Sequence, residues 1–282
     1  MDAVVRKAER LSKDSHVGAP IGNITRGTTH PHRMRRVDRW LTGTQTALLR
    51  ASGDALAVDL GFGASPVTTL EMFQALRNVN PHMRVLGLEI EKDRVALAQA
   101  AAQEGLAFAL GGFELNTAQR PLVVRAFNVL RQYQEDDVAA IWTRMTSRLA
   151  PGGLLIEGTC SEIGRVATWV ALRQTGPESL TIAMRFGSFD VPSDAAERLP
   201  KALIHRNTPG ERIYAFLQAC DAAWIHAASL GSFGARQRWI HMCLQLKNGG
   251  WPILGGVSRW RLGELSVAWD AVRPDSVRPD GA

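Results

Sequence analysis

Short apolar runs alternate with amphipathic stretches along the first two thirds of this chain. Five of the runs predict buried strands, at residues 56–60, 85–90, 106–110, 123–130 and 154–158. Apolar residues at helical spacing separate most of these strands and also precede the first one, from Arg33 to Arg50. Strands that alternate with helices in this way are typical of βαβ units, so we expect an α/β fold with a mainly parallel sheet.

The pattern changes after the fifth predicted strand. Residues 167–174 and 180–186 flank Gly176-Pro177 and predict an antiparallel hairpin, whereas residues 194–247 follow a mainly helical pattern. We therefore expect three parts: a helical N-terminal cap over residues 1–52, a core over residues 53–190 and a mainly helical C-terminal elaboration over residues 191–282.

The composition is that of an ordinary globular protein. Of the 282 residues, 45% are hydrophobic and 21% are charged. No apolar run reaches the roughly 18 residues of a membrane span, and residues 1–13 lack the apolar stretch of a secretion signal. Cys160, Cys220 and Cys243 are far apart and odd in number, so we expect no disulfide framework and no metal site. These features predict a cytoplasmic protein with no membrane partner.

Glycines and carboxylates follow two neighbouring strands of the predicted sheet. Asp59-Leu60-Gly61-Phe62-Gly63 ends the first strand, and Glu89 ends the second. Because parallel strands end at the same edge of a sheet, these groups are expected to meet where ligands bind. Glycine lets the backbone approach a ligand closely, and a carboxylate accepts hydrogen bonds from ribose hydroxyls. The pattern predicts a nucleoside-containing ligand.

A nicotinamide dinucleotide is the first alternative. Its glycine motif requires a third glycine, where this chain has Pro66. Asp59 would also repel a pyrophosphate, whereas it suits a ligand with a positive amino group and no phosphate. We therefore favour S-adenosylmethionine (SAM) over a dinucleotide; the remaining interpretation is a glycine turn that binds no ligand.

Residues 56–158 resemble the SAM-binding core of the class I SAM-dependent methyltransferases. The resemblance rests on Val58–Gly63, on Leu88-Glu89-Ile90 and on Leu149–Leu154, and departs from the family at Ser65, where a third glycine is frequent. It implies a Rossmann-like three-layer α/β sandwich. Its mainly parallel, seven-stranded sheet would end in an antiparallel hairpin, and its cofactor would be SAM.

The resemblance also implies which residues bind the cofactor, with Phe113 and Glu114 at the adenine. The full set is Asp59, Gly61, Phe62, Gly63, Glu89, Ile90, Phe113, Glu114 and Asn128. Polar groups near the end of the fourth strand, together with one N-terminal arginine, are the candidate substrate residues: Arg26, Arg131, Gln132 and Tyr133. Val129-Leu130 replaces the two prolines of the motif found in amino-group methyltransferases that act on nucleobases.

Methyl transfer is an in-line displacement in which the protein chiefly positions the reactants and, where required, removes a proton. No residue is assigned as the catalytic base from the sequence. The titratable side chains considered for that role are His30, His32, Glu157, Glu162 and His205.

The net charge of +6 raises the question of an anionic partner. Five arginines, at positions 26, 33, 35, 36 and 39, share a stretch with a single acid, Asp38. This stretch suits an RNA-binding strip, a clamp on an acidic metabolite or a solvated helix face. With two tyrosines and no basic–aromatic stacking platform, a small-molecule acceptor is favoured over RNA.

The expected function is SAM-dependent methylation of a small or glycan-like metabolite; the alternatives are an RNA methyltransferase, a SAM-binding module without turnover and a dehydrogenase.

Overall fold

The computed structural model describes residues 20–275 and forms two compact units. The first unit comprises Met1–Gly164 with Leu172–Gly176, and the second comprises Arg165–Ala171 with Pro177–Ala282. Residues 1–19, which belong to the predicted N-terminal cap, and residues 276–282 lie outside the described part of the chain. Among the described residues no helix has both the length and the apolar character needed to cross a membrane.

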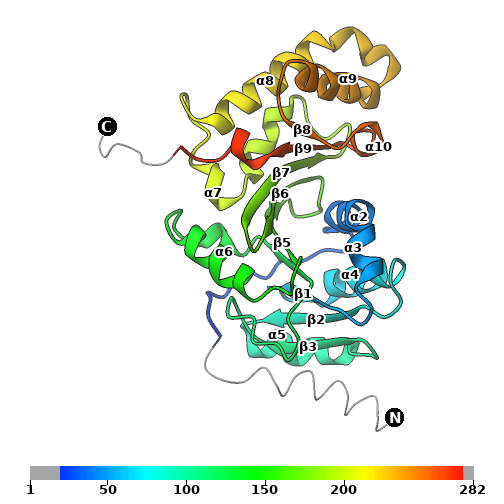
Figure 1. Ribbon diagram of the computed structural model, residues 1–282, viewed down its shortest axis with the longest axis vertical. Helices are drawn as coiled ribbons and strands as arrows, with labels where there is room; N and C mark the ends of the chain where they lie inside the picture. Colours follow the sequence, from blue (N-terminus) through cyan, green and yellow to red (C-terminus); the bar gives the residue numbers. More distant parts are fainter. Residues whose placement is uncertain (1–19, 276–282) are drawn as a thin grey trace. The chain divides into compact units, whose positions relative to one another are not determined.

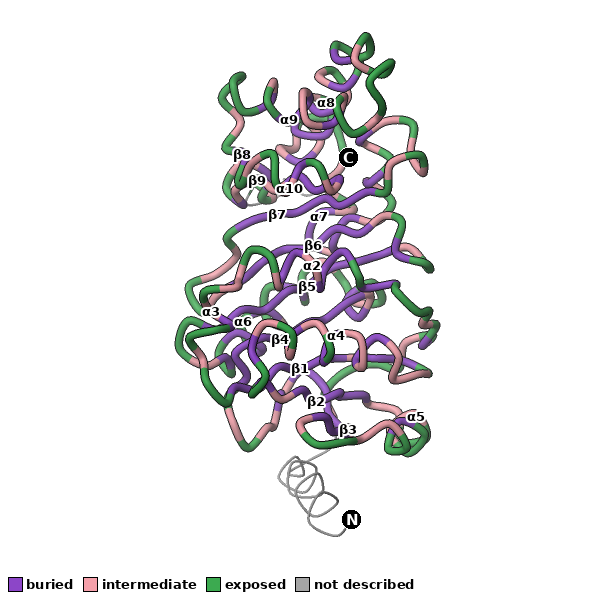
Figure 2. Tube along the Cα trace, turned by 90° about the vertical axis from the view of Figure 1, so that its right-hand side faces the viewer, coloured by how far each residue is buried: buried purple, intermediate pink, exposed green. Residues whose placement is uncertain are grey.

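The first unit is built on five parallel strands, which Figure 2 shows as largely buried. They are β1 (Leu56–Leu60), β2 (Arg84–Glu89), β3 (Leu106–Leu110), β4 (Val123–Phe127) and β5 (Leu154–Cys160). Their spatial order is β3-β2-β1-β4-β5, and each neighbouring pair is parallel. The order reverses between β1 and β4. In open α/β sheets, ligands bind outside the carboxyl ends of the strands at such a switch point.

Helices pack on both faces of these strands. They are α2 (Arg35–Thr44), α3 (Thr46–Ala51), α4 (Val67–Arg77), α5 (Lys92–Ala98) and α6 (Asp137–Ser147), with short 3₁₀ turns η1 (Gln99–Ala101) and η2 (Leu130–Gln132). In Figure 1, α2 and α4 lie on one side of the strands and α6 lies on the other. The helix α6 buries Val138, Trp142 and Met145, which recur at the spacing of one helical face.

The second unit is a smaller antiparallel sheet with helices. The strands β6 (Val166–Arg173) and β7 (Gly176–Met184), which lie mostly in this unit, are joined by a two-residue turn. β7 pairs with β9 (Glu264–Ala268), which pairs with β8 (Ile253–Leu254), both antiparallel. The helical elements are η3 (Pro192–Arg198), α7 (Lys201–Ile204), α8 (Arg212–His226), η4 (Ala228–Phe233), α9 (Ala235–Asn248), α10 (Val257–Trp260) and η5 (Trp269–Ala271).

The mixed α/β architecture, its parallel strands and its hairpin are confirmed, but the strand number is corrected. The described residues form nine strands rather than seven. The two extra strands, β8 and β9, lie in the region expected to be mainly helical. β8 is two residues long and leaves no periodic pattern, whereas in β9 the buried Leu265 and Val267 flank the less buried Ser266.

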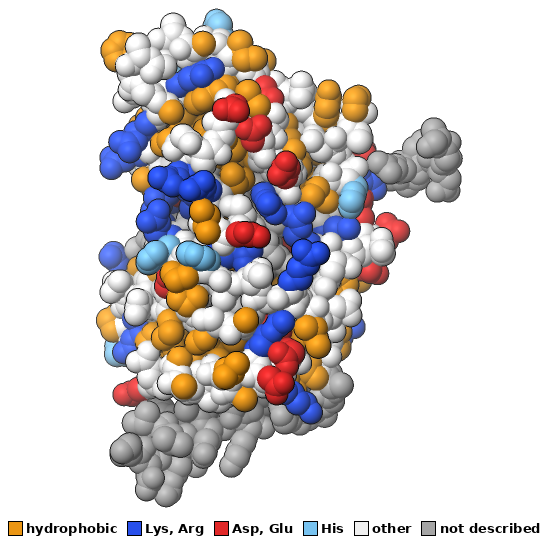
Figure 3. All heavy atoms as spheres, turned by 180° about the vertical axis from the view of Figure 1, so that it is seen from behind, with side chains coloured by type: hydrophobic (Ala, Val, Ile, Leu, Met, Phe, Trp, Pro, Cys, Tyr) orange, Lys and Arg blue, Asp and Glu red, His pale blue; other side chains and the backbone are white. Residues whose placement is uncertain are grey.

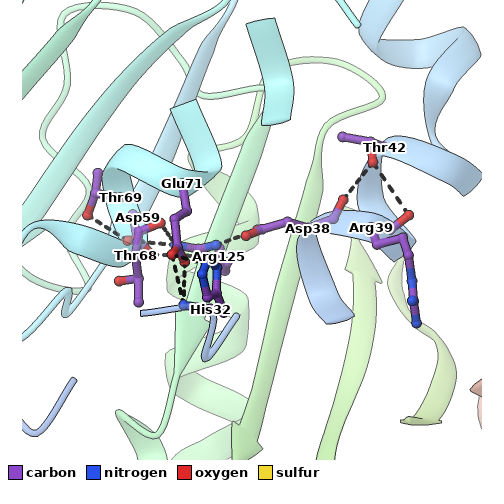
Figure 4. A network of polar contacts seen from close by, with 9 residues as sticks. All are labelled: His32, Asp38, Arg39, Thr42, Asp59, Thr68, Thr69, Glu71 and Arg125. Atoms are coloured by element: carbon purple, nitrogen blue, oxygen red, sulfur yellow. Dashed lines mark hydrogen bonds and ion pairs between the residues drawn. The ribbon is translucent and has the colours of Figure 1, made fainter. Parts of the chain in front are cut away.

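A buried ion-pair network joins α2 to the sheet of the first unit (Figure 4). Arg125 in β4 is fully buried and lies opposite Asp59 in the β1–β4 register. Its Nε–H donates to Asp59 Oδ1 at 2.9 Å and its Nη2–H to Asp59 Oδ2 at 2.8 Å. Its other terminal nitrogen, Nη1, pairs with Asp38 of α2. The hydroxyl of Thr69 in α4 also donates to Asp59, at 2.8 Å. One guanidinium therefore holds two carboxylates from different elements.

The charges of this network explain why Arg125 cannot be removed without cost. Burial raises the pKa of Asp38 to about 6, although Arg125 opposes the shift. Without the guanidinium, Asp38 and Asp59 would face each other as buried carboxylates with no compensating charge. Breaking a buried pair by removing one partner is strongly destabilising for this reason.

Replacing Arg125 by methionine (Arg125→Met) is therefore expected to lower the free energy of unfolding by about 3–5 kcal/mol, as measured by urea denaturation. Arg84→Met is the matched control, because Arg84 pairs with the exposed Asp54 and such pairs contribute about 0–1 kcal/mol. Equal losses in the two variants would contradict the role given to Arg125.

Candidate functional site

The glycine loop after β1 has a backbone that only glycine adopts without strain. Gly61 and Gly63 have φ angles of +74° and +84°. A Cβ on Gly61 would lie 2.8 Å from Val129 Cγ2, and one on Gly63 would lie 2.7 Å from the carbonyl oxygen of Gly27. Both glycines are thus required by their backbone angles and by the close approach of neighbouring segments.

Glu89, at the end of β2, is bound to this loop. Its Oε2 accepts the N–H of Gly63 at 2.9 Å, and its Oε1 accepts the N–H of Ile90 at 3.0 Å. The guanidinium of Arg94 lies 3.7 Å from the same carboxylate, which is 2% exposed. An ionised carboxylate has about four acceptor positions, so Glu89 keeps acceptor capacity toward a ligand beside the loop.

The loop after β3 presents an adjacent donor and acceptor. The N–H of Gly112 donates to Glu114 Oε1 at 2.7 Å and orients that carboxylate. The other oxygen of Glu114, Oε2, lies beside the N–H of Phe113, since both of these groups bind Ile21. The ring of Phe113 is buried and packs edge-on against Tyr133, with centroids 5.3 Å apart.

Residues 20–29, which we call the strap, run over the carboxyl ends of these strands. Ile21 contacts the loop after β3 through both backbone groups, at 2.8 and 2.9 Å. Asn23 donates its N–H to the Tyr133 hydroxyl at 2.5 Å and accepts from Gln132 Nε2 at 2.8 Å. The carbonyl of Thr25 accepts from Arg94 at 2.9 Å, and that of Gly27 accepts from Ala64 at 2.8 Å.

A hollow of about 270 Å³, including the part open to solvent, lies between the strap and the strand ends. It is lined by the strap residues Ile21, Gly22, Asn23 and Thr25 and by Leu60, Gly61, Glu89, Ile90, Gly111, Gly112, Phe113 and Val129. Because four of the lining residues belong to the strap, the strap takes up part of the space at the strand ends.

The structure brings together several of the residues predicted to bind the cofactor. Gly61, Glu89, Ile90 and Phe113 line the hollow. Gly63 and Glu114 lie beside it, through their hydrogen bonds to Glu89 and Ile21.

Three other residues of the predicted cofactor set point elsewhere, and their expected ligand contacts are not supported by their positions. The carboxylate of Asp59 is engaged by Arg125 and Thr69. Phe62 packs edge-on against Phe108 in the core, with centroids 5.3 Å apart.

Asn128 is the third of these residues, and its side chain faces β5. Its φ angle is +58°, a left-handed conformation that asparagine tolerates better than most residues. Its Oδ1 accepts the N–H of Cys160 at 3.0 Å, and its Nδ2–H donates to the sulfur of Cys160 at 3.3 Å. Asn128 thus fixes the ends of β4 and β5 relative to each other.

The predicted substrate residues divide into two pairs. Gln132 and Tyr133 hold Asn23 of the strap. Arg26 and Arg131 are exposed and do not line the hollow. Sequence reasoning missed Arg94, which joins the strap to two acids: its Nη2–H donates to Thr25, its Nη1 lies near Glu89, and its Nε is 3.3 Å from Glu91. The pair with Glu91 could have been predicted, because the two residues are three positions apart. The contact with Thr25 of the strap could not, because the two residues are far apart in the sequence.

The N-terminal arginines do not form a solvated strip. Arg33 and Arg36 are each 8% exposed and bind backbone carbonyls near the end of β5. Arg33 donates to Ser161 at 3.2 Å and Arg36 to Gly164 at 3.1 Å. On the face shown in Figure 3, basic side chains are interspersed with acidic and apolar ones. A phosphate-binding strip, one of the alternatives left open for these arginines, would lose two of its five members to structural contacts.

The candidate bases do not converge on the hollow. Glu157 of β5 is buried, and burial raises its pKa to about 8, against a smaller opposing effect of a hydrogen bond from Trp142. His32 pairs with Glu71 at 3.2 Å, and His205 contacts Lys201 at 3.0 Å. His30 and Glu162 are exposed and do not line the hollow either.

The chain is similar over part of its length to several solved structures. No protein-family model matches the chain, and no curated protein matches it. The mitomycin 7-O-methyltransferase MmcR is 20% identical, with a TM-score of 0.31, over 44% of this chain and 38% of its own.

Two further structures are similar to a comparable extent. The amino pentose methyltransferase CalS10 from Micromonospora echinaspora is 18% identical, with a TM-score of 0.33, over 56% of this chain and 70% of its own. The CcbJ methyltransferase from Streptomyces caelestis is 20% identical, with a TM-score of 0.34, over 54% of this chain and 65% of its own. This chain spans well under half the length of the first of the three proteins.

The raised pKa of Glu157 predicts a pH-dependent stability. Between about pH 4.5 and pH 8 the unfolded chain releases this proton while the folded protein keeps it, so stability falls as the pH rises through that window. The slope from this one group is about 1.4 kcal/mol per pH unit. Glu157→Gln is expected to remove that slope in urea denaturation at pH 5, 6 and 7. An unchanged slope would show that Glu157 is ionised in the folded protein.

Proposed function

We propose that this chain is a SAM-dependent methyltransferase that acts on a small-molecule acceptor. The observation that carries the proposal is the alignment of three groups along the ends of adjacent strands at the switch point. These groups are the Gly61–Gly63 loop after β1, the Glu89 carboxylate after β2 and the Phe113–Glu114 pair after β3.

Each group matches one part of the cofactor. Glu114 Oε2 and the Phe113 N–H offer an acceptor and a donor to the amino group and ring nitrogen of adenine. Their fit to such a pair is supported by Ile21, whose backbone N–H and C=O bind them at 2.8 and 2.9 Å. Glu89 would accept from the ribose hydroxyls, and Gly61, which lines the hollow, would lie against the methionine part. When bound, SAM supplies an electrophilic methyl group on a sulfonium.

The preference for SAM over a dinucleotide has a different basis from the one expected at the outset. The charge of Asp59 is compensated by Arg125, so it no longer argues against a pyrophosphate. Pro66 at the N-cap of α4, in place of the third glycine of a dinucleotide loop, still does.

A small acceptor is favoured over RNA because of where the N-terminal arginines lie. The burial of Arg33 and Arg36 removes the continuous basic strip that a phosphate backbone requires. Gln132 and Tyr133, after the end of β4, are the polar groups placed to position an acceptor, because they lie beside the hollow. In such an enzyme the protein contributes mainly by holding the two reactants in line.

Thermal unfolding with SAM, S-adenosylhomocysteine, NAD and NADP tests the cofactor assignment. At a ligand concentration of about 100 times the dissociation constant, we expect about 2.7 kcal/mol of stabilisation by the first two ligands. Glu89→Gln should lose this stabilisation. Glu91→Gln, which changes the neighbouring acid outside the hollow, should keep it. Stabilisation by NAD or NADP alone would overturn the assignment, and stabilisation of Glu89→Gln equal to wild type would remove Glu89 from the site.

A further inference from the structure

We propose that the strap, residues 20–29, is a tethered competitor of the cofactor rather than a cover that closes over it. This inference rests on the proposed function, because the groups that the strap occupies are those assigned above to the cofactor. Cofactor binding and the seated strap would then exclude each other.

The first step is the contact at the adenine position. The N–H of Ile21 donates to Glu114 Oε2 at 2.8 Å, and its carbonyl accepts from the Phe113 N–H at 2.9 Å. A single residue thus presents a neighbouring donor and acceptor to the two groups that would read the amino group and ring nitrogen of adenine. The absence of a side chain at Gly112 allows this approach, since a Cβ there would overlap the Ile21 carbonyl.

The second step is the path of the strap beyond Ile21. Asn23 is held near the end of β4 by Tyr133, and Thr25 is held beside Glu89 by Arg94. Gly27 then accepts from the N–H of Ala64 in the glycine loop. The backbone of the strap therefore binds the two adenine-reading groups directly and runs past Glu89 and the glycine loop along the hollow. A cover would leave the adenine-reading groups free for the ligand and contact its outer side.

The third step concerns how firmly the strap is held. Ile21 and Ile24 are 42% and 60% exposed, so the strap is seated mainly by backbone hydrogen bonds and buries little apolar surface. Such a segment opens at low free energy. The apparent affinity for the cofactor falls by the fraction of molecules in which the strap has left.

Two substitutions at one position test this in the full-length chain. Ile21→Pro removes the N–H that binds Glu114, while Ile21→Ala shortens the side chain and keeps that N–H. Neither changes a residue that is assigned to the cofactor. We expect Ile21→Pro to bind S-adenosylhomocysteine about tenfold more tightly in calorimetry, the size of one lost hydrogen bond to a charged group, and Ile21→Ala to remain within about twofold of wild type.

Hydrogen exchange of the wild-type chain gives a second readout that does not depend on turnover. Added S-adenosylhomocysteine should speed exchange at residues 21–27 and slow it at residues 61–64 and 111–114. Slower exchange at both places would identify a closing cover and overturn the competitor. Equal affinities of wild type and Ile21→Pro would also overturn it while leaving the proposed function standing. Failure of all variants to bind the probe would reject both.

Discussion

The buried guanidinium of Arg125 is the interaction on which the rest of the first unit depends. It neutralises Asp59, which ends β1 immediately before the glycine loop, and Asp38, in the first turn of the helix that follows the strap. Because a buried carboxylate is stable only when it is paired, both elements are held to β4 at one point. The start of the glycine loop and the helix that follows the strap are thereby anchored to the same strand.

From this anchor the site follows by strand register. Parallel pairing places the ends of β1, β2 and β3 side by side, so that Gly61, Glu89 and the Phe113–Glu114 pair form one row. The strap runs along this same row of groups. A single geometric feature, the shared edge of the strands, thus explains both the candidate binding site and the segment lying in it.

Features of the candidate site could be predicted from the sequence where they depend on residues close together in the chain. The placement of Gly61, Gly63 and Glu89 at neighbouring strand ends could be predicted, because a strand end, a tight turn and a following helix leave local patterns. The ion pair of Asp59 could not be predicted, because its partner, Arg125, is 66 residues away and no local pattern reports a long-range ion pair. The contact of the Asn128 amide with Cys160 could not be predicted for a similar reason, since Cys160 lies on another strand.

The strap contacts could not have been predicted at all, because they are made largely by main-chain groups. A peptide N–H or carbonyl is the same in every residue, so recognition of this kind places few demands on side-chain identity. Within the strap the two glycines are exceptions: Gly22 and Gly27 have φ angles of +151° and +70°, and a Cβ on Gly27 would lie 2.5 Å from Arg94. During evolution the other side chains of the strap are therefore free to diverge while its position is kept. Related chains could therefore have a strap in the same place with little sequence similarity in that segment.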